Sequence, residues 1–173
     1  MTSGRIIFLN GTSSAGKSTL AHALRAQLDE PFSLYASDQL ADAGFRPIDP
    51  RYRADGRERF FDGFHRSIAG FAEAGNDLIV EHIVEQQSWA DQLAELTRNF
   101  DVFWVGVHAP LTILERREHE RGDRQVGEAA YHLKTHDYCR YHIEVDTTTR
   151  PIEQVAAVVA EAWRQRATPQ LPA

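Results

Sequence analysis

Residues 11–18 read Gly-Thr-Ser-Ser-Ala-Gly-Lys-Ser, with two glycines separated by four residues and followed directly by Lys17 and Ser18. An apolar run at 5–10 precedes this octet and an amphipathic pattern follows it, so the octet joins a buried strand to a helix. In that context it predicts a P-loop, because glycine dihedrals let successive backbone N–H groups converge on phosphate oxygens at the start of a helix. A Gly/Ser turn that binds nothing is the weaker alternative.

The P-loop hypothesis gives the octet defined roles toward a nucleotide. We expect Lys17 to reach the β- and γ-phosphates and Ser18 to place its hydroxyl on Mg²⁺, an ion that needs only one or two protein oxygens here. The remaining nucleotide-binding positions are Gly11, Thr12, Ser13, Ser14, Ala15, Gly16 and Thr19. The expected cofactors are therefore ATP and Mg²⁺.

Length and composition fit an ordinary globular protein. With 173 residues, 42% of them hydrophobic, we expect one domain over 1–173 with a single core. The net charge of −6 gives no general footprint for nucleic acid, and no apolar run is long enough to cross a membrane. The single cysteine, Cys139, excludes an internal disulfide, and no leader is apparent. These features predict a cytoplasmic protein without nucleic-acid or membrane partners.

Strand-like and helix-like patterns alternate along the chain. This alternation predicts an α/β protein with a three-layer P-loop NTPase fold, in which a five-stranded parallel sheet is covered by helices on both faces. Ligands then bind beyond the carboxyl ends of the strands. A tail at 166–173, which holds two prolines, is expected to fray. We expect strands at 5–10, 32–36, 77–84, 101–107 and 141–145, and helices at 17–28, 57–74, 87–98, 110–121, 126–135 and 151–163.

The helix expected at 57–74 carries apolar residues at three- and four-residue spacing. We expect its phenylalanines to serve the core, although one or two could line an apolar substrate pocket. The preceding segment, 44–56, has no usable period and is expected to be irregular and near the substrate. The apolar positions of the helix are Phe60, Phe61, Phe64, Ile68 and Phe71.

Asp38 follows the second expected strand, on the sheet edge that also carries the P-loop. A carboxylate placed there could accept the proton of an acceptor hydroxyl, which makes Asp38 the candidate general base. In the alternative interpretation, Ser37 or Asp38 only caps a short helix through Leu40.

Glu81 and His82 end the third expected strand. Glu81 is a candidate to lie near Mg²⁺ or its waters, and its alternative is a solvated strand end. For His82 we favour a satisfied interior histidine over a catalytic role. His132 and His136 are four residues apart, but without a third ligand a solvated helix face is favoured over a metal site.

Arginines gather around a glycine at 116–127, a segment that joins two expected helices. Such guanidinium groups suit a lid that closes over the transferring phosphate, with Arg117, Arg121 and Arg124 as the candidate catalytic arginines. A solvent-facing helix end with ion pairs is the alternative. Thr147, after the fifth strand, is a weaker candidate for contact with the nucleotide.

Taken together, these segments resemble the chloramphenicol phosphotransferase family, and their order and spacing match along nearly the whole chain. The resemblance implies transfer of the γ-phosphate of ATP to a hydroxyl, with Asp38 as base, Lys17 on the phosphates, Ser18 at Mg²⁺ and the arginines near Gly122 in a lid. The segments that carry the resemblance are 7–18, Asp38, 101–107, 121–124 and 144–148.

The chain departs from that family pattern in two places. Where the family's third strand ends in paired aspartates, this chain has Glu81 and His82, and the stretch 44–64, which would shape the acceptor pocket, offers no match. The acceptor's identity therefore does not follow from the resemblance.

The sequence as a whole predicts an ATP-dependent O-phosphotransferase acting on a small hydroxylated molecule, such as chloramphenicol or a related antibiotic. Two alternatives stay open: a kinase of another small metabolite, and a nucleotide-binding switch. A GTPase switch is disfavoured because the chain has no Asn-Lys-x-Asp motif to read guanine.

Overall fold

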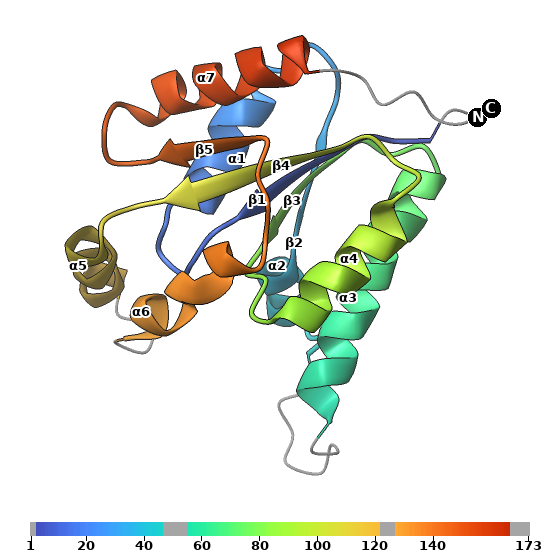
Figure 1. Cartoon of the computed structure of the whole chain (residues 1–173), viewed down its shortest axis with the longest axis horizontal. Coiled ribbons are helices and arrows are strands. Elements are labelled where there is room, and N and C mark those ends of the chain that lie inside the picture. The colour runs from blue at the N-terminus through green and yellow to red at the C-terminus, as the bar shows by residue number, and fades with distance from the viewer. Residues whose placement is uncertain (1–2, 47–54, 122–126, 167–173) are drawn as a thin grey trace.

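One sheet of five parallel strands forms the centre of the protein in the computed structural model, which describes residues 3–46, 55–121 and 127–166 (Figure 1). The strand order is β2-β3-β1-β4-β5, which places β1 in the middle. The strands are β1 (Ile6–Asn10), β2 (Ser33–Ala36), β3 (Leu78–His82), β4 (Val102–His108) and β5 (Ile143–Asp146). The three-layer α/β fold predicted from the alternating pattern is thus confirmed.

Helices cover both faces of this sheet. One face carries α1 and α7, and the other carries α3 and α4, whereas α5 and α6 lie beyond the carboxyl ends of the strands (Figure 1). The helices are α1 (Lys17–Arg25), α2 (Ser37–Asp42), α3 (Gly56–Glu73), α4 (Gln87–Thr97), α5 (Leu111–Arg121), α6 (Glu128–His132), the 3₁₀ helix η1 (Leu133–Asp137) and α7 (Ile152–Gln165).

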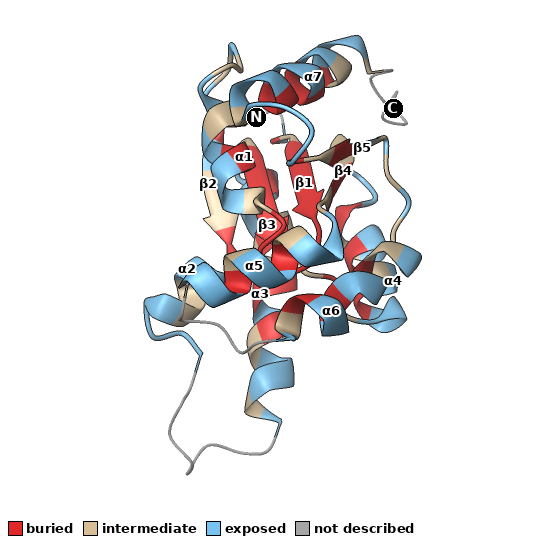
Figure 2. Cartoon of the chain, turned by 90° about the vertical axis from the view of Figure 1, so that its left-hand side faces the viewer, coloured by how far each residue is buried: buried red, intermediate tan, exposed pale blue. Residues whose placement is uncertain are grey.

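The two cores follow from the alternation of side chains along each strand. In β1, Ile7 and Leu9 pack with α1 and α7, whereas Ile6 and Phe8 pack with α3 and α4. All five residues of β1 are buried, as expected for a central parallel strand covered on both faces (Figure 2). The predicted P-loop therefore starts from the most deeply buried strand of the sheet.

Strand register brings the predicted polar ends together. Asn10 pairs with His82 across β1 and β3, and Ala36 pairs with Glu81 across β2 and β3. Because the strands are parallel, the residues that follow β1, β2 and β3 all lie at one sheet edge.

Several helix boundaries differ from the expected ones. The first helix ends at Arg25 instead of Leu28, and Ser37 and Asp38 open a helix, α2, that the main sequence interpretation did not include. The helix expected at 126–135 consists of two short pieces, α6 and η1, because apolar spacing does not separate an α-helical turn from a 3₁₀ turn.

The phenylalanines of α3 serve the core only in part. Phe61 and Phe64 are buried, whereas Phe71 is 47% exposed and packs its ring edge against Tyr35. The expectation that Phe71 is a core residue was therefore wrong, because three- and four-residue spacing does not show which positions of a helix its neighbours cover.

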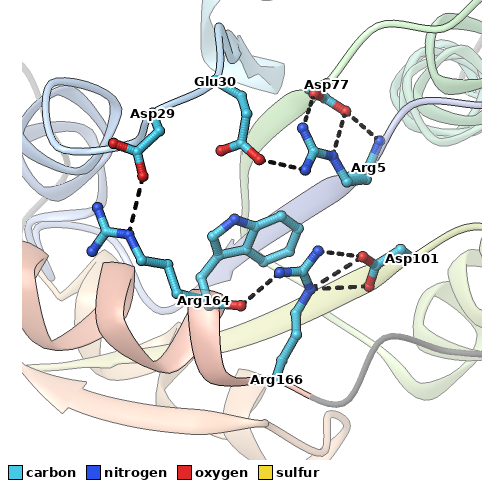
Figure 3. Close-up of polar contacts among 8 residues, drawn as sticks. Arg5, Asp29, Glu30, Asp77, Asp101, Arg164 and Arg166 are labelled. Atoms are coloured by element: carbon cyan, nitrogen blue, oxygen red, sulfur yellow. Dashed lines mark hydrogen bonds and ion pairs between the residues drawn. The ribbon is translucent and has the colours of Figure 1, made fainter.

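Arg5 and Arg166 each bind an aspartate that precedes a strand, at the amino-terminal edge of the sheet (Figure 3). Both guanidinium groups also lie over the Trp163 ring. Arg5 donates three hydrogen bonds to Asp77, and Arg166 bonds Asp101. Arg166 was expected to begin a frayed tail, but this ion pair and the Trp163 ring hold it against the fold; the rest of the predicted tail lies outside the described residues.

Asp77→Asn is expected to lower the free energy of unfolding by about 2 kcal/mol, because hydrogen bonds to a charged group are the stronger kind and the new amide would point a donor at Arg5. Burial opposes ionisation of Asp77, but hydrogen bonds from Arg5 outweigh it and lower the pKa of the carboxyl. Urea titration measures the change. Glu95→Gln, which breaks the exposed pair with Arg98, should cost less than about 1 kcal/mol. Equal losses in the two variants would contradict this account.

Candidate active site

The P-loop takes backbone conformations that its sequence is suited to. Gly16 lies in the left-handed region at φ 90°, and Ser14 lies there at φ 60°. A Cβ added to Gly11 would come within 2.3 Å of the Val107 carbonyl oxygen, so only glycine fits beside β4. The loop is therefore shaped by its two glycines as the motif predicts.

Two polar groups of this loop are suited to bind phosphate. Lys17 Nζ donates to the carbonyl oxygens of Gly11 and Thr12, at 2.9 and 2.8 Å, so its charge lies directly over the loop. Ser14 Oγ is buried and has no hydrogen-bond partner within the part of the chain that the structure describes. A buried hydroxyl without a partner is costly, and a phosphate oxygen would satisfy it. The loop thus fits a nucleotide phosphate.

Ser18 and Glu81 provide an oxygen pair at the end of β3. Ser18 Oγ donates to Glu81 Oε2 at 2.7 Å, and Glu81 is only 6% exposed, so the alternative of a solvated strand end was wrong. Among the described residues, no cluster of three His, Cys, Asp or Glu side chains could cage a metal. A hydroxyl and a carboxylate beside a phosphate site nevertheless fit Mg²⁺, which takes few protein oxygens.

A cleft of about 680 Å³ opens between the P-loop, α2, the end of β3 and α5. It brings together the P-loop, Asp38 and Glu81, which the sequence analysis had placed at one edge of the sheet. Lining residues from α2 are Ser37, Asp38, Gln39 and Asp42; those from β3 and its end are Glu81, His82 and Ile83; Arg117, Glu120 and Thr147 close the cleft on the other side.

Asp38 lies in the first turn of α2 and does not act as its N-cap. The N-cap residue is Ala36, whose backbone N–H donates to Gln39 Oε1 at 3.2 Å. The short helix that the alternative interpretation predicted is present as α2, but its N-cap is Ala36 and neither Ser37 nor Asp38. The Asp38 carboxylate lines the cleft from the first turn of α2, on the same sheet edge as the P-loop.

Arg117 connects α5 to the P-loop. Its Nη1 donates to the Ser14 carbonyl oxygen and to Thr147 Oγ1, both at 3.1 Å, and Thr147 Oγ1 donates to the Ala15 carbonyl oxygen. The two candidates Arg117 and Thr147, predicted separately, thus meet at the loop. The side chain of Arg121 and all of Arg124 lie outside the described residues, so their predicted lid role stays a prediction.

Glu118 is a structural residue of this site that the sequence analysis missed. It is fully buried, and its carboxylate accepts the backbone N–H groups of Gly127 and Ala129 at the start of α6. The carbonyl oxygen of Ala129 in turn accepts Thr12 Oγ1–H at 2.6 Å. Glu118 thereby connects α5 to the start of α6, and Ala129 connects α6 to the P-loop. An acidic residue at helix spacing on an otherwise charged helix gives no sequence signal for this.

Asn10, the last residue of β1, anchors the start of the P-loop through hydrogen bonds of its side chain. Asn10 Nδ2 donates to the Tyr141 hydroxyl at 2.7 Å, and that hydroxyl lies 2.8 Å from His136 Nδ1. The Asn10 side chain also accepts the Val84 N–H. His132 and His136 were expected on a solvated face, but His132 is buried and His136 is partly buried, because η1 folds back under the loop.

Mild acid is expected to destabilise the protein through His136. Burial, with the nearby charges of His108 and Lys17, lowers the pKa of His136 to about 4. As the pH falls, this histidine is therefore protonated at a higher pH in the unfolded chain than in the folded protein. The free energy of unfolding should therefore be fully present above pH 6.5 and fall as the pH drops from about 6.5 toward 4. Urea titrations at pH 7, 6 and 5 measure this slope. His136→Gln should reduce this slope without abolishing it, because burial also lowers the pKa values of His65 and His82. An equal slope in the variant would contradict the assignment.

Comparisons with solved structures place this fold among P-loop kinases. The APS kinase of Mycobacterium tuberculosis, solved with AMPPNP and APS, superposes with a TM-score of 0.74 at 17% identity, over 95% of this chain and 99% of that chain. The tunicamycin resistance protein of Deinococcus radiodurans gives a TM-score of 0.70 at 21% identity, over 96% and 99%. At these identities the likeness shows the fold, which is that of a P-loop kinase.

The sequence itself gives the family. A Mycobacterium tuberculosis protein named "Putative O-phosphotransferase" is 29% identical, over 95% of this chain and 84% of its own length. The family described as "Chloramphenicol phosphotransferase-like protein" matches residues 4–164, and the chain belongs to it. Family and fold together support a small-molecule phosphotransferase of the kinase type. Within the described residues, no helix is long and apolar enough to cross a membrane.

Proposed function

We propose that this protein transfers the γ-phosphate of ATP to a hydroxyl group of a small molecule. The observation that carries the proposal is the convergence, in one cleft, of the P-loop with Lys17, the Ser18–Glu81 pair and the Asp38 carboxylate. A phosphate site with a carboxylate on the opposite wall has the parts that phosphoryl transfer to an acceptor requires.

In the proposed reaction, Asp38 accepts the proton of the acceptor hydroxyl. The acceptor oxygen then forms a bond to the γ-phosphorus while the bond from that phosphorus to the β-phosphate oxygen breaks, releasing ADP. Lys17, now bonded to loop carbonyls, would move its donors to the phosphates and stabilise their charge. Ser18 and Glu81 would hold Mg²⁺, which neutralises phosphate charge when bound.

Arginines of the α5 region are proposed to complete the site around the transferring group. Arg117 already contacts the P-loop through Ser14, which supports a role close to the nucleotide. Arg121 and Arg124 follow in the same segment and are proposed to act with it as a lid. Thr147, held against Ala15, is proposed to border the nucleotide.

An acceptor screen tests the proposal. ADP release would be followed with ATP and Mg²⁺ in the presence of chloramphenicol, other hydroxylated antibiotics and hydroxylated metabolites. Chloramphenicol is included because of the family to which the chain belongs. Acceptor-stimulated ADP release with a phosphorylated product supports a kinase. Tight ATP binding with slow hydrolysis that no acceptor stimulates would instead support a nucleotide-binding switch.

A further inference from the structure

A chain of hydrogen bonds runs from the wall of the cleft through the core to the surface of α3. Ser37 Oγ lies 3.2 Å from His82 Nδ1, and His82 Nε2 lies 3.0 Å from His65 Nε2. From His65 the chain continues to Gln92 and on to Asp62. We call these five residues the histidine relay. It connects α2, β3, α3 and α4, which the sequence separates widely.

The outer end of the histidine relay fixes which atoms donate. Arg66 pairs with Asp62 at 2.9 Å, and hydrogen bonds from Arg66 and then Gln92 lower the pKa of Asp62, so this carboxylate only accepts. Gln92 must therefore turn its Nε2 toward Asp62, at 2.5 Å. Its Oε1 is left to accept the Nδ1–H of His65, at 2.9 Å.

This direction propagates inward to the cleft. A neutral His65 with its proton on Nδ1 offers Nε2 as an acceptor, so His82 donates its Nε2–H. His82 Nδ1 then accepts the O–H of Ser37. Burial lowers the pKa of His65, which agrees with a neutral ring. Each donor of the relay meets one acceptor, so a single arrangement of protons satisfies the whole chain.

Aromatic side chains hold the inner histidine in place. The rings of Phe61, Phe64 and Trp89 lie 5.5, 5.0 and 5.6 Å from the His82 ring, centre to centre. His82 is 2% exposed and Ser37 is 8% exposed. In such a packed interior the imidazole cannot turn away, so the Ser37 hydroxyl has a fixed partner.

We infer that the histidine relay is a positioning device for the acceptor side of the site, which fixes Ser37 at the start of α2 and thereby Asp38, the next residue. This inference rests on the proposed function, in which Asp38 accepts the hydroxyl proton. The relay supplies a rigid anchor where β2 is only an edge strand of four residues. A catalytic group displaced by about 1 Å can cost about a hundredfold in rate, so such an anchor has kinetic consequences.

Ser37→Ala tests the inner end of the relay. We expect kcat to fall at least about tenfold while the KM for ATP stays within about twofold, because the P-loop is untouched. Ser37→Thr keeps a hydroxyl for His82 and should restore most of the rate. Ser67→Ala is the matched control, since Ser67 bonds Tyr35 in the same core but lies outside the relay; it should lower the melting temperature without lowering kcat.

Gln92→Ala tests the outer end, far from the cleft. It removes the group that fixes the His65 proton on Nδ1, so the direction of the whole relay is no longer set. We expect kcat to fall about threefold or more with the KM for ATP unchanged. If Ser37→Ala and Gln92→Ala both lower the melting temperature yet keep kcat within about twofold of wild type, the relay residues only stabilise the fold and do not position Asp38. That result would overturn the inference.

Two measurements do not depend on any acceptor. Histidine ring NMR should show the Nδ1–H form of His65 and the Nε2–H form of His82; the opposite forms would overturn the relay even in an active enzyme. Amide hydrogen exchange of residues 37–42 should accelerate in Ser37→Ala but not in Ser67→Ala, and unchanged exchange would also overturn it. A wild-type protein with these signatures and no acceptor-stimulated turnover would instead contradict the proposed function.

Discussion

Asp38→Asn is expected to lower kcat for acceptor phosphorylation by about two to four orders of magnitude, because asparagine cannot take a proton from a hydroxyl at neutral pH. ATP affinity should barely change, since the proposed phosphate contacts are made by the P-loop and not by α2. The melting temperature should shift by a few degrees at most, because the N-cap of α2 is Ala36 and a favourable charge in the first turn of a helix is worth about 0.5 kcal/mol. Steady-state kinetics, nucleotide titration and thermal melting measure the three quantities.

Asp42→Asn is the matched control for this prediction. It removes the same charge from the same helix and also faces the cleft. If Asp38 acts as a base, Asp42→Asn should change kcat by no more than a few-fold. Equal losses in the two variants would indicate that the cleft needs negative charge and not a base at one position. If Asp38→Asn turns over near the wild-type rate, Asp38 is not the general base, and Glu81 becomes the candidate.

Lys17→Ala is expected to reduce phosphoryl transfer roughly a thousandfold, because removing a preorganised donor for developing phosphate charge has effects of this size. The fold should stay intact, since Lys17 bonds two loop carbonyls at the cleft and is not part of either core. Turnover, ATP affinity and the circular dichroism spectrum are the measurements.

Lys134→Ala provides the control, because Lys134 is the other lysine of the chain and its ammonium lies over the Tyr131 ring, 4.8 Å from its centre. Its turnover should match wild type. A folded Lys17→Ala protein with near-normal turnover would remove the P-loop from the mechanism.

Sheet and P-loop could be predicted because their signals are local. An apolar run followed by two spaced glycines constrains the chain to strand, loop and helix, whatever surrounds it. The six-residue helix α2 gave no such signal, because fewer than two turns contain no measurable period. The exposure of Phe71 depends on which elements pack against α3 at that position, which spacing along one helix does not determine.

Site residues were predictable where they follow strands. Asp38, Glu81 and Thr147 each lie within two residues of the end of a strand, and parallel strands bring such positions to one edge. The contacts of His65, Glu118 and Asn10 join residues far apart in the sequence, and no periodicity couples them. Of the relay, the sequence analysis had singled out Ser37, as a possible cap, and His82, as a satisfied interior histidine, but not the contact between them.

The P-loop and α2, which line two sides of the cleft, follow strands that differ in burial and therefore in local stability. The phosphate loop leaves β1, which neighbours enclose on both sides, whereas Asp38 follows β2, a short strand at the rim with an exposed first residue. Rim elements open at lower free energy than central ones, and substitutions there cost less of the total stability. Under the proposed function, substitutions in the acceptor wall should therefore be tolerated more easily than substitutions in the buried nucleotide wall. Proteins with this fold could then change their acceptor while keeping the same site for the phosphate donor.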